Sequence, residues 1–246
     1  MFHLISDLNL DLNEKAEDQN VINSKSCDYI IIAGNVSNEI KRSMFYAENL
    51  ARLYPDSKII YNFGLNELVG KRYQSVEDGI DIKINRFRNC PDNLFYPKGQ
   101  IIDNHDFLCS IGWPRFRSED DFKKTFLPEW CVIDYTEKLY IGDIKVSDTY
   151  WRCFNQEFIN QKIEEENNKI QNWLNNDQGF QKILITSTGP NYTKFFNNAE
   201  YTVLDNLDLK DIIWIHGGDK QYLEKLSLCY PGRDRSNEID LDLLKI

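Results

Sequence analysis

Five polar segments, each of which follows an apolar run, contain side chains suited to binding a metal ion or a phosphate ester. In an open α/β sheet, ligands bind in the loops just beyond the carboxyl ends of the strands. Carboxylate and amide oxygens and imidazole nitrogens are the groups that ligate divalent metals there. We therefore expect one cleft, formed by residues 6–9, 33–38, 64–67, 186–190 and 216–220.

The stretches between these segments predict the elements that place them. Short apolar runs predict strands at residues 2–6, 29–33, 58–62, 182–186 and 211–216. Shorter strands are predicted at residues 93–96, 100–102 and 106–113, of which the last two form a hairpin around His105. Apolar residues at helical spacing predict helices at residues 37–54, 75–89 and 150–176. This alternation of strands and helices indicates an α/β fold.

The spacing also assigns a buried face to two of the helices. The first helix should bury Ile40, Met44, Ala47, Leu50 and Leu53. The last helix should bury Phe154, Phe158, Ile159, Ile163, Ile170 and Trp173. Because no repeat or long linker divides the chain, residues 1–246 are predicted to form one domain, with an aromatic-rich excursion at about residues 114–150.

The excursion and its flanks carry a set of large aromatic residues. These side chains either form a partner-binding surface or pack over the sheet as additional core. We favour packing, because aromatic side chains bury readily wherever they can. The set comprises Trp113, Phe116, Phe122, Phe126, Trp130, Tyr135, Tyr140, Tyr150 and Trp151.

Composition excludes several classes of partner. The net charge is 29 − 39 = −10 and the pI is about 4.9, which argues against binding to nucleic acid or to an anionic membrane. No run approaches the ~18 apolar residues of a membrane helix, and the N-terminal residues lack the pattern of a secretory signal. The six cysteines form no C-x-x-C pair, so we expect reduced core cysteines and a cytoplasmic protein.

The five polar segments resemble, in order and approximate spacing, the motifs of the calcineurin-like metallophosphoesterases. Residues 5–10 (ISDLNL) resemble the form ISDLHL, and residues 32–38 (IAGNVSN) resemble LAGDVSN. Residues 213–217 (IWIHG) resemble the start of WIHGHTH. The resemblance covers nearly the whole chain and implies a four-layer α/β/β/α sandwich of two mixed sheets flanked by helices. It also implies two divalent metals such as Mn, Fe or Zn and hydrolysis of a phosphate ester.

Most of the metal ligands that the family would supply are replaced in this chain. Of the expected set only Asp7 remains, with Asn38 nearby, and the amide, hydroxyl and apolar replacements are poor ligands for a metal pair. Asn66 stands where the family has its catalytic His, so we expect no catalytic residue and no bound metal. The other replaced positions are Asn9, Asn35, Leu65, Ser187, Thr188, Gly218 and Lys220.

Two further residues bear on this cleft. Lys220 either pairs with Asp7 in place of a metal, or points to solvent beside Asp219. His216 precedes Gly217 rather than following it, so we interpret it as a structural residue at the end of a strand. The other two histidines, His3 and His105, lie in a strand and in a hairpin turn and cannot rebuild the site.

Three functions fit these residues. The replaced ligands favour a catalytically inactive phosphoesterase-like protein that acts as a binding or assembly module for another protein. The first alternative is a weak or altered hydrolase that holds a metal on Asp7. The second is a metal-free protein that binds a phosphorylated small molecule through Lys220 and the amides at the strand ends. Nucleotide-binding loops of the G-x-G-x-x-G or P-loop type are absent from the sequence.

Overall fold

The computed structural model describes most of the chain between Phe2 and Ile239. The described residues are 2–6, 8, 10, 27–68, 71, 73–86, 89–116, 118–120, 132–141, 144–153, 155–188, 199–200, 212–217, 227–229 and 237–239. For residues 74, 85–86, 132–141, 144–153, 199–200, 227–229 and 237–239 the description covers the backbone alone.

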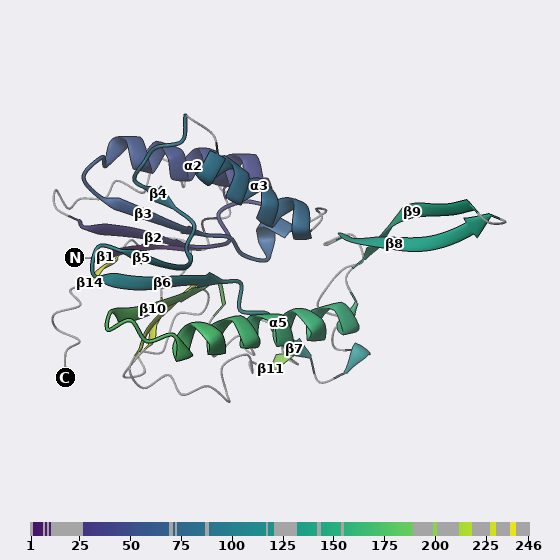
Figure 1. Cartoon of the computed structure of the whole chain (residues 1–246). Helices are drawn as coiled ribbons and strands as arrows, with labels where there is room; N and C mark the ends of the chain where they lie inside the picture. The colour runs from purple at the N-terminus through teal and green to yellow at the C-terminus, as the bar shows by residue number, and fades with distance from the viewer. Residues whose placement is uncertain are drawn as a thin grey trace.

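Two five-stranded sheets form the centre of the molecule (Figure 1). The first sheet is parallel except for its β14 edge, which runs antiparallel to β1. Its strands, in order, are β14 (Asn237–Ile239), β1 (Phe2–Ile5), β2 (Tyr29–Ala33), β3 (Lys58–Asn62) and β4 (Leu94–Phe95). The second sheet is parallel except for its β5 edge. Its strands, in order, are β13 (Ser227–Cys229), β12 (Ile212–His216), β10 (Gln181–Thr186), β6 (His105–Ser110) and β5 (Lys98–Ile102).

Helices cover the outer faces of both sheets (Figure 1). Helices α2 (Ile40–Leu53) and α3 (Tyr73–Arg86) lie over the first sheet, and α5 (Gln156–Asn175) lies over the second. The short 3-10 turn η1 (Asn66–Leu68) follows β3, and a small two-stranded sheet pairs β7 (Arg115–Phe116) with β11 (Ala199–Glu200). The predicted four-layer sandwich of two mixed sheets flanked by helices is therefore confirmed.

The two sheets pack directly against each other. Their central strands are apolar in the middle, as expected of strands that are buried on both faces, and Ile30, Ile60 and Leu184 are fully buried. Side chains also join the sheets by hydrogen bonds. The amide of Asn62 donates to the Ser110 carbonyl at 2.7 Å, and the Tyr29 hydroxyl donates to the Ile102 carbonyl at 3.3 Å. These bonds hold the two layers in register.

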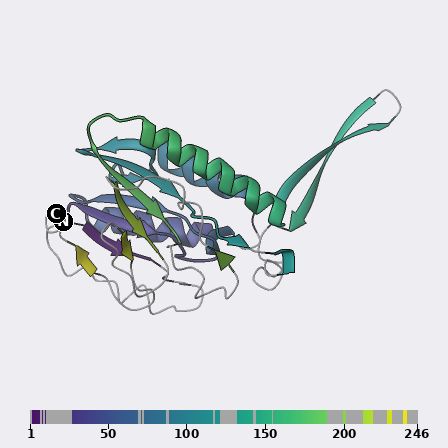
Figure 2. The ribbon, with the colours of Figure 1, turned by 90° about the horizontal axis from the view of Figure 1, so that it is seen from below.

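The predicted start of the last helix at residue 150 was wrong. Residues Ile144–Cys153 form β9, which pairs antiparallel with β8 (Val132–Ile141) in a long hairpin that stands away from the sandwich (Figures 1 and 2). Asn155 ends this hairpin region and caps the helix, because its side chain accepts a hydrogen bond from the Phe158 amide at 2.7 Å. The Gly142-Asp143 dipeptide between Ile141 and Ile144 is a turn signal in the sequence that would have favoured a hairpin.

The other helices depart from prediction mainly at their ends. Helix α2 begins at Ile40 rather than at residue 37, because the Ser37 hydroxyl accepts a hydrogen bond from the Glu39 amide just before the first turn. Met44, Ala47 and Leu50 are buried as predicted, whereas Leu53 in the last turn is 70% exposed. Helix α3 spans Tyr73–Arg86 instead of residues 75–89.

Several predictions for buried residues are confirmed. Ile159, Ile163, Ile170 and Trp173 form the buried face of α5, while Phe154 lies outside the described residues. Of the aromatic set in and around the excursion, Trp113 and Phe116 are buried, and the other side chains of the set lie outside the described part. Cys27 and Cys109 are buried, and neither forms a disulfide. Among the helices that the structure describes, none has the length and hydropathy needed to cross a membrane.

Candidate functional site

The loops that follow the parallel strands come together at one edge of the sandwich. A Cβ atom added to Gly217, after β12, would lie 2.3 Å from the Ser6 hydroxyl oxygen and 2.8 Å from the Ala33 carbonyl oxygen. A Cβ atom on Gly34 would lie 2.6 Å from Cβ of Ser187. Glycine at these positions therefore lets loops from both sheets approach within van der Waals contact, as the sequence pattern predicts.

Glu67 is the buried carboxylate at this edge, and four donors converge on it. Its oxygens accept hydrogen bonds from the amides of Val36 and Gly64, both at 2.8 Å, and from the Asn35 amide at 3.2 Å. The Ser43 hydroxyl of α2 donates a fourth bond at 3.2 Å. Burial raises the pKa of Glu67, and these hydrogen bonds oppose that rise. The carboxylate ties the β2 loop, the β3 loop and α2 together.

Asn35 fills the space between the first two loops. Its backbone adopts a positive φ of 56°, a conformation that asparagine accepts more readily than most residues. Its side-chain oxygen accepts a hydrogen bond from the Asn66 amide at 3.2 Å. A Cβ atom on Gly64 would lie 2.3 Å from that same oxygen. The side-chain oxygen of Asn35 is thus directed at the neighbouring loop. Asn38, another residue of this segment, lies half-buried between β2 and α2.

Three other replaced positions, Leu65, Ser187 and Thr188, are buried, and the last two form hydrogen bonds to the backbone. The Ser187 hydroxyl donates to the Ile111 carbonyl at 2.7 Å, and the Thr188 hydroxyl donates to the Gly112 carbonyl. Both side chains are fully buried, and Leu65 is only 3% exposed. Ser187 and Thr188 join the end of β10 to the segment after β6. They act as structural contacts at positions where the family resemblance places metal ligands.

The described residues at this edge do not fit a pair of divalent metals. Leu65 offers no donor atom, the two hydroxyl groups point at carbonyl oxygens, and the Asn35 oxygen already accepts a backbone amide. Within the part of the chain that the structure describes, no group of three His, Cys, Asp or Glu residues is placed to hold a metal ion. Asp7, Asn9, Gly218 and Lys220 lie outside the described residues, so the pairing of Lys220 with Asp7 stays a prediction.

His216 is buried at the end of β12, where the sequence predicts a structural residue. Its Nδ1 lies 3.1 Å from the Gly217 carbonyl oxygen, so that nitrogen carries the proton and donates. Its ring lies 5.2 Å from the ring of Trp214, between centroids. Burial lowers the pKa of His216 to about 4, and the ring is neutral at pH 7. His3 is buried in β1, and His105 opens β6 with its Nδ1 3.2 Å from the Tyr29 hydroxyl.

The depressed pKa of His216 predicts a loss of stability in acid. Between the unfolded value of about 6.5 and the folded value of about 4, the unfolded chain binds more protons than the folded one. Stability therefore falls as the pH is lowered, by about 2 kcal/mol between pH 7.5 and pH 5. Urea unfolding over this range, compared with His216→Asn, measures the loss. Asparagine keeps a donor for Gly217 and does not titrate, so identical pH profiles of the two proteins would contradict the assignment.

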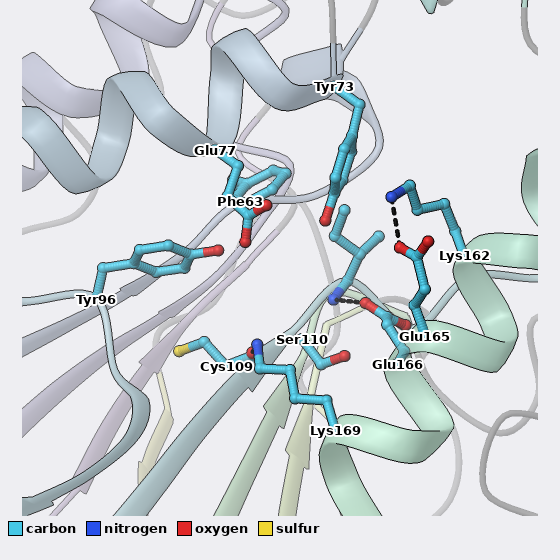
Figure 3. Close-up of a pocket in the computed structure, with 11 residues that line it drawn as sticks. Phe63, Tyr73, Glu77, Tyr96, Cys109, Ser110, Lys162, Glu165, Glu166 and Lys169 are labelled. Carbon is cyan, nitrogen blue, oxygen red and sulfur yellow. Dashed lines mark hydrogen bonds and ion pairs between the residues drawn. The ribbon is translucent and has the colours of Figure 1, made fainter.

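A second site, which the sequence analysis missed, lies between α3 and α5 (Figure 3). It is a cavity of about 200 Å³ whose floor is the end of β6 and the residue after β3. Tyr73 and Glu77 extend into it from α3, while Lys162 and Lys169 extend from α5. The remaining lining residues are Phe63, Tyr96, Cys109, Ser110, Ile111, Glu165 and Glu166. The signal was present in the sequence, because both helix pairs are spaced to share one helix face.

Glu166 supports the floor of this cavity from within α5. It is 8% exposed, and its carboxylate accepts hydrogen bonds from the amides of Ile111 at 2.8 Å, Gly112 at 3.2 Å and Trp113 at 3.4 Å. Burial raises the pKa of Glu166, and the hydrogen bonds from the Ser110 hydroxyl and the Ile111 amide, together with the nearby Lys169 ammonium, oppose that rise. This carboxylate holds the segment after β6 against α5, much as Glu67 holds the loops after β2 and β3.

Comparisons with known proteins bear on the fold. No family model and no curated protein sequence matches the chain. Among solved structures, the chain is similar to the phosphopantetheinyl hydrolase PptH from Mycobacterium tuberculosis, with a TM-score of 0.56 and 12% identity, covering 94% of this chain and 89% of that one. At this identity the likeness shows the fold alone. The chain therefore shares the two-sheet α/β fold of that hydrolase.

Proposed function

We propose that this protein is a catalytically inactive phosphoesterase-like protein that works as a binding or assembly module for another protein. The observation that carries the proposal is that the side chains at the strand ends bond to the backbone or pack in the core. Ser187 and Thr188 donate to backbone carbonyls, Asn35 accepts a backbone amide, and Leu65 is packed in the core. Such a set stabilises loops and supplies few electron pairs to a metal.

The projecting hairpin supports a role in binding a protein. Strands β8 and β9 pair over ten residues each, and they leave the sandwich as a two-stranded arm (Figure 2). An isolated two-stranded hairpin is at best marginally stable in water. A partner that packs against or extends the arm would supply the missing stabilisation, through side-chain contacts or through hydrogen bonds to its open edges.

Metal content and hydrolysis test the loss of catalysis. The purified protein, incubated with manganese and then desalted, should retain far less than one metal ion per chain. We expect no hydrolysis of bis-(p-nitrophenyl) phosphate that depends on a metal, that is, none that is lost when a chelator is added. An active metal-dependent phosphodiesterase serves as the positive control. Two bound ions per chain, or hydrolysis that stops on chelation and returns with manganese, would show that the protein is an enzyme.

A shortened variant tests the arm. Because Val132 and Cys153 are paired in register, their Cα atoms lie about 5 Å apart, and a short Gly-Ser linker can replace residues 132–153. This variant should lose the partners that the intact protein captures from its native host, while its unfolding midpoint stays unchanged. Phe45→Ser, which changes an exposed residue of α2, should keep them. Equal capture by the shortened variant would exclude the arm as the binding element.

A further inference from the structure

A groove of about 640 Å³ lies between helix α5 and the start of strand β5. One wall is formed by Lys98 and Gly99 of β5, and the other extends along α5 from Glu165 to Asn176. Eleven residues of helix rise by about 16 Å, so the second wall is long and narrow. The volume lies within the roughly 300–1,000 Å³ that is usual for ligand sites.

Strand β5 presents an open edge to this groove. It is the edge strand of the second sheet as described, and its first four residues are all exposed. In the register with β6, Lys98 pairs with Leu108 and Gln100 pairs with Phe107, so Gly99 has no residue opposite. Gly99 adopts a φ of 88°. A glycine at such a bulge often marks a place where another backbone approaches closely.

The indole N–H of Trp173 lies beside this bulge and has no hydrogen-bond acceptor among the described residues. Trp173 is 7% exposed, and a Cβ atom added to Gly99 would lie 3.4 Å from its Cδ1, the atom bonded to Nε1. The edge of the ring that carries the N–H therefore faces the start of β5, and Trp173 lines the groove. Because buried polar groups are nearly always hydrogen-bonded, this donor points to an acceptor that a ligand supplies.

Three asparagines line the α5 wall at a spacing of four residues. Asn168, Asn172 and Asn176 are all exposed in the groove. Residues four apart share one face of a helix and are separated by about 6 Å along its axis. Alternate residues of an extended chain are about 6.6 Å apart. Each amide side chain offers a donor and an acceptor, so the wall matches the N–H and C=O groups along one edge of an extended chain.

The charged residues of the groove already have partners on the protein. Lys98 lies 3.4 Å from Glu77, and Glu165 lies 2.5 Å from Lys162 one turn away. Lys169 donates to a main-chain carbonyl of β6 at 3.0 Å. The groups left for recognition are therefore neutral: the amides, the indole N–H and the main chain of β5.

We propose that this groove binds an extended peptide segment of a partner protein. Alternate residues of an extended chain direct their main-chain groups to opposite edges, so one edge of the peptide pairs with β5 and the other with the asparagines of α5. A peptide carbonyl accepts the Trp173 N–H. About five residues span the 16 Å wall. Main-chain hydrogen bonds supply the affinity, as in other cases of strand addition. The groove lies on the sandwich and is separate from the β8–β9 arm.

Peptide selection on the intact protein tests this site. The probe is a phage-displayed library of random heptapeptides, and the selected sequences are synthesised and titrated by fluorescence anisotropy. We expect at least one peptide that binds saturably. Asn168→Ala and Asn172→Ala should each raise its Kd by about three- to tenfold, the effect of one neutral hydrogen bond. Asn160→Ala makes the same change at an exposed position of α5 outside the groove and should leave the Kd unchanged.

Changes to the peptide separate main-chain from side-chain recognition. N-methylation of its central backbone amides should abolish binding, whereas alanine at most of its side chains should change the Kd by less than about threefold. The variant that lacks residues 132–153 should bind the peptide as the wild type does, so failure of the arm and failure of the groove are distinguished. The proposal is overturned if the library yields no binder. It is equally overturned if Asn168→Ala and Asn172→Ala bind as tightly as the wild type, or if the N-methylated peptide still binds.

Discussion

Replacement of Gly217 by alanine is expected to destabilise the fold by about 3 kcal/mol or more, at the upper end of what overpacking causes. The added methyl group would lie 2.3 Å from the Ser6 hydroxyl oxygen and 2.8 Å from the carbonyl oxygens of Ala33 and Ser187. Two of these atoms belong to the backbone and cannot rotate away. The three loops that meet here come from both sheets, so relief of the clash requires the sheets to separate. Urea unfolding followed by circular dichroism measures the change.

Gly79→Ala is the matched control for this experiment. Gly79 lies inside α3, and a Cβ atom added there meets no atom within 4 Å. Alanine in an open helical position stabilises by roughly 0.5–1 kcal/mol relative to glycine. The same chemical change should therefore have opposite signs at the two positions. If Gly217→Ala unfolds at the wild-type urea concentration, the close packing of the strand-end loops is wrong.

Glu67→Ala is expected to cost about 4 kcal/mol, because it leaves several buried donors without an acceptor. The amides of Asn35, Val36 and Gly64 would each lose their hydrogen bond, as would the Ser43 hydroxyl. Each orphaned buried donor costs about 1–3 kcal/mol, and partial entry of water reduces the sum. Chemical denaturation at pH 7 gives the free energy of unfolding directly.

Two comparisons make the Glu67 result specific. Glu67→Gln keeps the shape but turns an NH₂ group toward backbone donors, so a smaller loss of about 2 kcal/mol is expected. Glu164→Ala, on the exposed face of α5, should change stability by no more than about 0.5 kcal/mol. A Glu67→Ala protein as stable as Glu164→Ala would mean that the carboxylate does not hold the three elements together.

The sandwich could be predicted from the sequence because its strands carry strong local signals. The run at residues 29–33 is apolar throughout and that at residues 58–62 has an apolar centre, and the glycines after them mark where the chain turns. The hairpin could not be predicted in the same way. Its second strand ends in Tyr150-Trp151-Arg152-Cys153, which continues the apolar spacing of α5, and only the pairing with Val132–Tyr135 decides the conformation.

The sequence predicted where the strand-end loops meet better than it predicted what their side chains contact. Residue types predicted that Asn35, Leu65 and Ser187 are weak metal ligands, which follows from their atoms alone. That Ser187 donates across to the Ile111 carbonyl depends on the distance between loops 76 residues apart. The cavity lined by Tyr96 and Ser110 depends likewise on how far α3 stands from α5. Distances between layers are set by the whole core, and no local pattern encodes them.

The pairing of Val132 with Cys153 has a consequence for how this chain tolerates change. The β8–β9 arm begins and ends at this pair, and its residues are matched one to one down to Ile141 and Ile144. Insertion or removal of one residue in each strand at paired positions would lengthen or shorten the arm while its ends stay fixed. The reach of this protein can therefore vary independently of its layered body, because loop closure penalties grow only slowly with length.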